Sequence, residues 1–172
     1  MKKIIGCLTL ALLTSACGWQ LRGTADISKN LSQVYIAADE SKGALVSELK
    51  KSLIANNVKL LDDSKQANYI LTIHQENQDK RTTGVGSDAL SSAYELTLKA
   101  GYEISTKNTV LPSKATAISV RNFNYTAASI SSATQEEALL ITEMRRDLIQ
   151  QILRRLNAVV THPPVASSSN PE

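Results

Sequence analysis

The clearest hydrophobic pattern in this 172-residue chain is a strict alternation that runs from Ala93 to Ile104. One set of alternate positions is apolar or aromatic: Tyr94, Leu96, Leu98, Ala100, Tyr102 and Ile104. The set between them is polar or small: Ala93, Glu95, Thr97, Lys99, Gly101 and Glu103. Successive side chains of a β-strand point to opposite faces, so this pattern predicts a long antiparallel strand with one buried and one wet face.

Three other segments are typical of strands. Residues 33–37 are rich in β-forming side chains, and residues 67–74 alternate between apolar and polar positions. A turn at residues 106–109 and a break at Pro112 allow residues 115–123 to return as a fourth strand. The last two strands are therefore expected to form a hairpin.

Two segments have apolar residues at helical spacing. The first starts at Ser41, which suits an N-cap, continues through Ile54 and stops at the asparagine pair 56–57. The second opens with a capping box at residues 134–137 and keeps a spacing of three or four as far as Val159. Its acidic start and basic end complement the helix dipole.

The elements thus follow the order strand, helix, strand, strand, strand, helix. Two layers bury every apolar face, so we expect an α/β (α+β) two-layer sandwich with both helices on one face of a four-stranded, mostly antiparallel mixed sheet. The face that carries Glu95, Thr97, Lys99 and Glu103 is left exposed or available to a partner. Residues 79–87 are expected to form a loop between long strands.

The chain begins with the features of a bacterial secretory leader. Two lysines are followed by an apolar run over residues 4–13, which is too short to span a bilayer. Residues 13–17 resemble a lipobox that ends in Cys17, although ordinary cleavage after Ala16 is the alternative. We expect acylation of Cys17, because an unpaired exposed thiol is a liability in an oxidising compartment. Because Gly18 follows where an aspartate would retain a lipoprotein on the inner membrane, we expect lipid anchoring to the outer membrane.

The expected organisation is a signal peptide (1–16), a lipidated N-terminus and tether (17–32), one α/β domain (33–160) and a disordered tail (161–172). The formal net charge is +3, and subtracting the two leader lysines leaves about +1. This small positive charge does not indicate a surface that binds polyanions, which argues against nucleic-acid binding. With one cysteine outside the leader, the mature chain has neither an internal disulfide nor a cysteine-rich metal site.

Candidate catalytic chemistry is sparse. His74, expected at a strand end, has no cysteine, second histidine or acidic pair at recognisable spacing, so it is interpreted as a satisfied or solvated histidine. The Gly84-Val85-Gly86 segment lacks the third glycine and following helix of a phosphate cradle. We therefore predict no catalytic residue, no metal and no cofactor. A periplasmic hydrolase would require a set of acids, bases or nucleophiles that the sequence does not provide.

Several short motifs, in order, resemble the lipopolysaccharide-assembly lipoprotein family, LptE. They are residues 17–22 (Cys-Gly-Trp-Gln-Leu-Arg), 57–62 (Asn-Val-Lys-Leu-Leu-Asp), 93–96 (Ala-Tyr-Glu-Leu), 121–123 (Arg-Asn-Phe), 142–144 (Thr-Glu-Met) and 154–156 (Arg-Arg-Leu). The family fold, two helices on a four-stranded sheet, agrees with the layer prediction. The resemblance implies a domain that plugs an outer-membrane β-barrel (LptD-like), assists its assembly and helps deliver lipopolysaccharide to the outer leaflet. The alternative is a lipid-tethered scaffold or binding module of another envelope complex, such as one for barrel assembly.

The resemblance also implies lipopolysaccharide binding through basic side chains in loops at one end of the fold. Lys80 and Arg81, in the expected loop between the second and third strands, are the candidates here, together with Arg121 in the fourth strand. Solvated side chains without a ligand are the alternative. The segment 124–133, before the last helix, contains no lysine or arginine.

Overall fold

Five strands form one sheet in the part of the chain that the computed structural model describes, namely residues 31–86, 91–107, 112–124 and 130–162. The strands are β1 (Gln33–Ala38), β2 (Lys59–Leu61), β3 (Tyr69–Val85), β4 (Ser91–Thr106) and β5 (Ser113–Asn124), in the spatial order β2-β1-β3-β4-β5. The helices are α2 (Ala44–Ala55), a short 3-10 turn η2 (Ser64–Gln66) and α3 (Ile130–Thr161). β1 is parallel to β2 and β3, and the other pairs are antiparallel, so the predicted mixed sheet is confirmed.

The predicted count of four strands is wrong, because Lys59–Leu61 forms an additional edge strand. Gln33 lies opposite Lys59 and Tyr35 opposite Leu61 in a parallel ladder. Asn57 has a φ of 60°, which turns the chain out of α2 as the asparagine pair predicted and directs it back along β1. Three residues are too few to show an alternation, so the sequence pattern could not indicate this strand.

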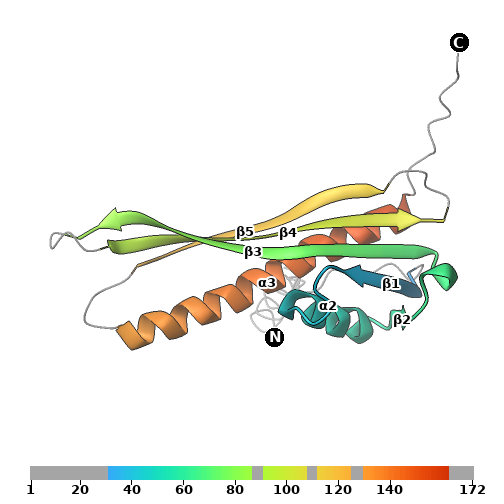
Figure 1. Cartoon of the computed structure of the whole chain (residues 1–172), viewed down its shortest axis with the longest axis horizontal. Coiled ribbons are helices and arrows are strands. Elements are labelled where there is room, and N and C mark those ends of the chain that lie inside the picture. Colours follow the sequence, from blue (N-terminus) through green and yellow to red (C-terminus); the bar gives the residue numbers. More distant parts are fainter. Residues whose placement is uncertain (1–30, 87–90, 108–111, 125–129, 163–172) are drawn as a thin grey trace, which may run out of the picture.

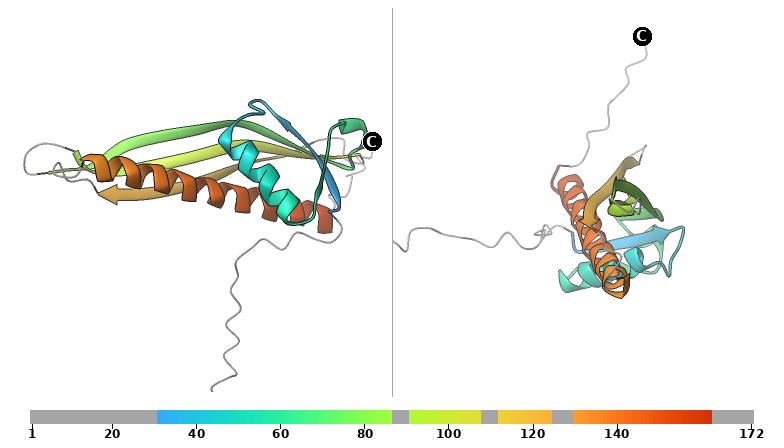
Figure 2. Two further views of the ribbon diagram at one scale, coloured as in Figure 1. Left: turned by 90° about the horizontal axis from the view of Figure 1, so that it is seen from below. Right: turned by 90° about the vertical axis from the view of Figure 1, so that its left-hand side faces the viewer.

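Both long helices cover the same face of the sheet, as predicted (Figure 1). α3 runs along the length of the sheet, and α2 lies beside the C-terminal half of α3 (Figure 2). The largest fully buried side chains come from both helices and from the two strands β3 and β4: Leu49, Leu53, Leu71, Ile73, Leu96, Leu98, Ile104, Met144, Leu148, Ile152, Leu153 and Leu156. The predicted burial of the apolar face of β4 is confirmed from Leu96 to Ile104.

The two helices begin at different residues from those predicted. α2 begins at Ala44 after Gly43, whose extended backbone forms the N-cap, and no side chain caps the helix, so Ser41 is not the cap. α3 begins at Ile130, four residues before the predicted capping box at 134–137. Serine and alanine are tolerated in a first helical turn, and here they extend the helix beyond the apolar pattern.

β3 is much longer than the predicted strand at residues 67–74. It continues to Val85, and its ladder with β4 pairs Asp79 with Thr97 and Arg81 with Glu95. Residues 79–85 therefore belong to a strand rather than to the predicted loop. An irregularity between Ile73 and Glu76 shifts the register of this ladder. Beyond it, polar side chains occupy both faces of β3, which explains why alternation did not indicate a strand there.

The described residues begin at 31 and end at 162, on either side of the expected domain at 33–160. Leu31, in the expected tether, is buried in the core two residues before β1. At the other end, Thr161 still belongs to α3, and its hydroxyl donates to the Asn157 carbonyl. The expected leader, Cys17 and the tail from residue 163 lie outside the described residues.

Candidate functional site: the charged clusters of the sheet

Lys80 lies on the face of β3 that packs against the helices. It pairs in the ladder with the buried Leu96, and its Nζ lies 2.5 Å from an oxygen of Glu137 on α3. The same ammonium lies 4.6 Å from the ring centre of Tyr94 and 5.3 Å from that of Phe123. These two rings stack with centres 5.5 Å apart, so Lys80 is held by a carboxylate and two aromatic faces.

Arg121 also lies on the helix-facing side of the sheet. It is opposite Leu96 in the β4–β5 ladder, and its guanidinium forms an ion pair with Asp147 of α3. The buried Ser119 donates its hydroxyl to the same carboxylate over 3.1 Å. Arg121 therefore attaches β5 to α3 and is itself 41% exposed.

Arg81 lies on the opposite, uncovered face of the sheet. Its Nε is 2.8 Å from Glu95 on β4, and its side chain is 67% exposed. Lys80, by comparison, is 37% exposed. The three predicted cations thus do not form one patch, since two face the helices and one faces away, and each has a carboxylate partner.

A fourth cation, Arg145 of α3, was not indicated by the sequence. Its guanidinium donates to both carboxylate oxygens of Glu76 on β3, over 3.0 and 2.8 Å, and lies 3.7 Å from Glu48 on α2. The side chain is only 14% exposed. Hydrogen bonding to Glu76 raises the pKa of the Arg145 guanidinium above its ordinary value. Because its partners are far away in sequence, no local motif could have revealed this cluster.

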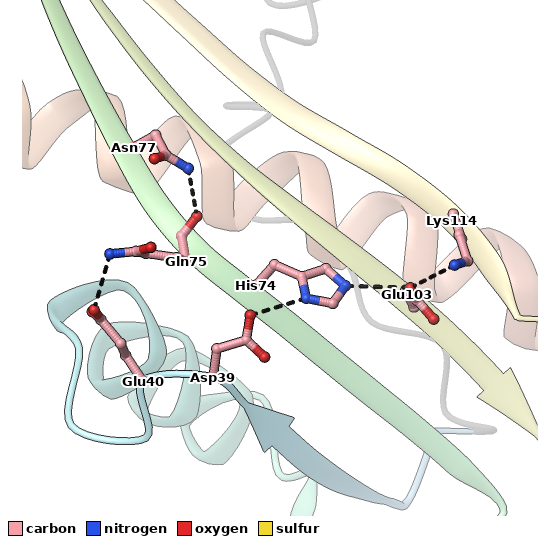
Figure 3. A network of polar contacts seen from close by, with 7 residues as sticks. All are labelled: Asp39, Glu40, His74, Gln75, Asn77, Glu103 and Lys114. Carbon is pink, nitrogen blue, oxygen red and sulfur yellow. Dashed lines mark hydrogen bonds and ion pairs between the residues drawn. The ribbon is translucent and has the colours of Figure 1, made fainter.

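His74 forms the centre of a polar network on the uncovered face of the sheet (Figure 3). Its ring Nδ1 lies 3.1 Å from Asp39, which follows β1, and its Nε2 lies 3.3 Å from Glu103 of β4. Lys114 of β5 lies 3.1 Å from the same oxygen of Glu103. The imidazole packs across Gly101, where an added Cβ would lie 3.4 Å from ring Cδ2. The network therefore joins β1, β3, β4 and β5.

The charges in this network act on each other's protonation. Hydrogen bonding to Asp39, and then to Glu103, raises the pKa of His74 above 6.5. The ammonium of Lys114, and then His74, lowers the pKa of Glu103 below its ordinary value. The predicted position of His74 at a strand end is wrong, and the sequence indicated no acidic pair at recognisable spacing from it. His74 lies within β3, and its carboxylate partners are 35 and 29 residues away in sequence.

Ion pairs lie on both faces of the sheet within the described residues. No group of three or more histidine, cysteine, aspartate or glutamate side chains is arranged there to hold a metal ion. None of the helices in these residues is long and apolar enough to cross a membrane. Glu103 beside His74 pairs with Lys114, and the uncovered sheet face also presents the ion pair Arg81–Glu95. This arrangement defines the class as an α+β two-layer domain with one free sheet face.

Comparison with known proteins identifies the family. The lipopolysaccharide-assembly family LptE matches residues 31–156, and the chain belongs to this family. A relative from Photorhabdus laumondii named LPS-assembly lipoprotein LptE is 26% identical over 149 residues, covering 86% of this chain and 81% of the relative. A Pectobacterium atrosepticum protein of the same name is 26% identical over 148 residues, covering 84% and 79%.

Solved structures share the fold at low sequence identity. The rare lipoprotein B from Shewanella oneidensis superposes with a TM-score of 0.69 at 17% identity, covering 75% of this chain and 96% of that one. A lipoprotein B from Nitrosomonas europaea gives a TM-score of 0.69 at 22% identity, with coverage of 84% and 94%. These similarities support the mixed α+β architecture with five strands and two long helices.

Proposed function

We propose that this protein is an outer-membrane lipoprotein that binds and plugs a large β-barrel translocon, assists its assembly and helps deliver lipopolysaccharide to the outer leaflet. The observation that carries the proposal is the family match over residues 31–156, which covers nearly all of the described domain. Its relatives are named for lipopolysaccharide assembly. In this role the protein acts by binding, without catalysis.

The surface chemistry supports a place inside a barrel. The lumen of a large outer-membrane barrel is polar and filled with water, so a plug needs polar faces whose charges are already balanced. The uncovered sheet face carries the pairs Arg81–Glu95 and Lys114–Glu103 and the exposed Lys99. Paired charges lose less solvation free energy on approach to a polar wall than isolated ones do.

Anchoring is proposed to occur through Cys17. Acylation after removal of residues 1–16 would tether the domain to the periplasmic side of the outer membrane without a spanning segment. The 13 residues between Cys17 and Leu31 reach at most about 45 Å when fully extended. The domain would therefore remain within about one membrane thickness of its anchor, close enough to enter a barrel from the periplasm.

Direct contact with lipopolysaccharide is proposed to begin at Arg81. Among Lys80, Arg81 and Arg121 it is the most exposed, so it is the one best placed to meet a phosphate. Lys80 and Arg121 would have to exchange Glu137 and Asp147 for the ligand, and those carboxylates hold α3 to the sheet. Their contribution to binding is therefore expected to be smaller than that of Arg81.

Depletion of the protein in its own cells tests the proposed function. We expect the barrel partner to lose its folded, heat-modifiable form and surface lipopolysaccharide to fall. A folded barrel together with normal surface lipopolysaccharide would contradict the proposal. Affinity purification from detergent-solubilised membranes separates the alternative, because a scaffold of another envelope complex would bring down a different barrel.

A further inference from the structure

The connection from β1 to α2 crosses the edge of β3 at the point where the β3–β4 register shifts. The Asp39 amide donates to the Ile73 carbonyl over 3.1 Å, which extends the β1–β3 ladder by one bond. The Asp39 carboxylate lies against His74, and Gln75 donates to Glu40 over 3.2 Å. Three polar contacts thus fasten this connection to β3, and Figure 3 shows the two that side chains make.

These contacts close one side of a small cavity between the connection, α2 and β3. Its volume is about 130 Å³, and its lining includes Glu40, Leu45, Val46, Ile73, His74 and Glu76. Leu45, Val46 and Ile73 belong to the core, so the connection separates core side chains from solvent at this edge. Release of the connection would expose them.

The hydrogen-bond geometry around His74 fits the protonated imidazolium better than the neutral imidazole. A neutral imidazole carries one N–H, whereas the imidazolium carries two. Both ring nitrogens face carboxylate oxygens, at 3.1 Å from Asp39 and 3.3 Å from Glu103, so only the imidazolium donates to both. Loss of the proton breaks one hydrogen bond and places a nitrogen lone pair against a carboxylate.

The charged groups around the ring come from every neighbouring element. The β1–α2 connection contributes Asp39 and Glu40, β4 contributes Glu103, and β5 contributes Lys114 through its contact with Glu103. Glu76 of β3 lines the cavity beside His74, but its carboxylate is occupied by Arg145. The acidic groups named here are more numerous than the basic ones, so the surroundings favour the positive charge on His74.

We propose that His74 is a pH-operated latch: as an imidazolium it fastens the β1–α2 connection to β3 and β4, and on losing its proton it loosens the connection, which then opens more often. Hydrogen bonding to Asp39 raises the pKa of His74 above 6.5, so the stabilisation is complete below 6.5 and is lost as the pH rises through the raised value of the folded state. Glu103, whose pKa is lowered, keeps its charge through this range. The latch is therefore closed from weakly acidic to near-neutral pH.

Amide hydrogen exchange of the full-length protein, purified in detergent, tests the latch. The reporter is the Asp39 amide, whose protection factor measures opening of the connection. Between about pH 5.5 and about pH 8.5 its protection factor, corrected for the intrinsic exchange rate, should fall about threefold to fivefold, as expected for partly exposed ion pairs. The same protection factor at both pH values would overturn the proposal.

The chain supplies its own control, because it has only two histidines. His162→Gln, at an exposed position at the end of α3, should leave the pH response of the Asp39 amide intact. His74→Gln and Asp39→Asn should each abolish that response. If NMR titration of the unaltered protein shows that the pKa of His74 is not raised above 6.5, the latch is refuted whether or not the variants fold.

Discussion

Replacement of Arg145 by methionine is the sharpest test of how the two layers are held together. Arg145 of α3 donates two hydrogen bonds to Glu76 and approaches Glu48 on α2, so one guanidinium links a strand and two helices. Arg145→Met keeps most of the aliphatic stem and removes only the charge and its donors. The measured change in unfolding free energy therefore reports the ion pair rather than lost packing.

The magnitude follows from burial. Removing one partner of a fully buried ion pair costs about 3–5 kcal/mol, because the other charge is left without compensation. Glu76 is 21% exposed, so water can solvate part of the abandoned carboxylate, and we expect a loss of about 2–3 kcal/mol. Urea unfolding of the full-length protein in detergent, followed by circular dichroism, measures this change.

Two further variants control the result. Arg146→Met makes the same substitution at the next residue, which is exposed beside the groove between α2 and α3, and should cost less than about 0.5 kcal/mol. Adding Glu76→Gln to Arg145→Met should recover part of the loss, because no unpaired charge is then left in the interface. Equal stability of Arg145→Met and Arg146→Met, or strict additivity in the double variant, would refute the reasoning.

Three other predictions concern the anchor, the ligand and the sheet edge. Cys17→Ala should abolish labelling of the mature chain with radioactive palmitate, and a labelled variant would show that acylation occurs elsewhere. Arg81→Glu should weaken lipopolysaccharide binding, and the loss should depend on salt concentration. Arg154→Glu, the same charge reversal at an exposed position of α3, should leave binding unchanged. Equal losses of binding in the two variants would show that Arg81 is not a specific contact. Gln151 donates to and accepts from the backbone of Ile118 on the edge strand β5, so Gln151→Ala should cost about 1 kcal/mol and promote association through that edge. Unchanged stability together with an unchanged oligomeric state in sedimentation would contradict the edge-covering role.

The sequence predicted those elements whose two faces differ. β4 alternates between a core that excludes water and an exposed face, so its period of two could be recognised from Leu96 and Leu98 beside Thr97 and Lys99. The outer half of β3 lacks this contrast, because Lys80 faces the helices as a paired charge. Its strand geometry follows from pairing with β4, which is a tertiary contact that a local pattern does not record.

Sequence patterns could not predict the charged clusters either, because these clusters also form through tertiary contacts. His74 and Asp39 are 35 residues apart, and Arg145 and Glu76 are 69 apart, so only the folded sheet brings them together. Lys80, Arg81 and Arg121 were predicted from the sequence as candidate lipopolysaccharide contacts, with solvated side chains as the alternative. In the structure Lys80 and Arg121 hold α3 to the sheet, which leaves Arg81 as the most exposed of the three.

The central claim, that the domain plugs a barrel, is tested most directly by photo-crosslinking from two sides of the molecule. Lys99 is exposed on the uncovered sheet face, and Arg154 is exposed on α3, in the layer that covers the other face. A photoreactive residue at each position, in cells that produce the full-length protein, reports what lies next to each side. A plug is surrounded by its partner, so both positions should crosslink to one and the same β-barrel. Crosslinking from only one side, or to two different proteins, would contradict the plug.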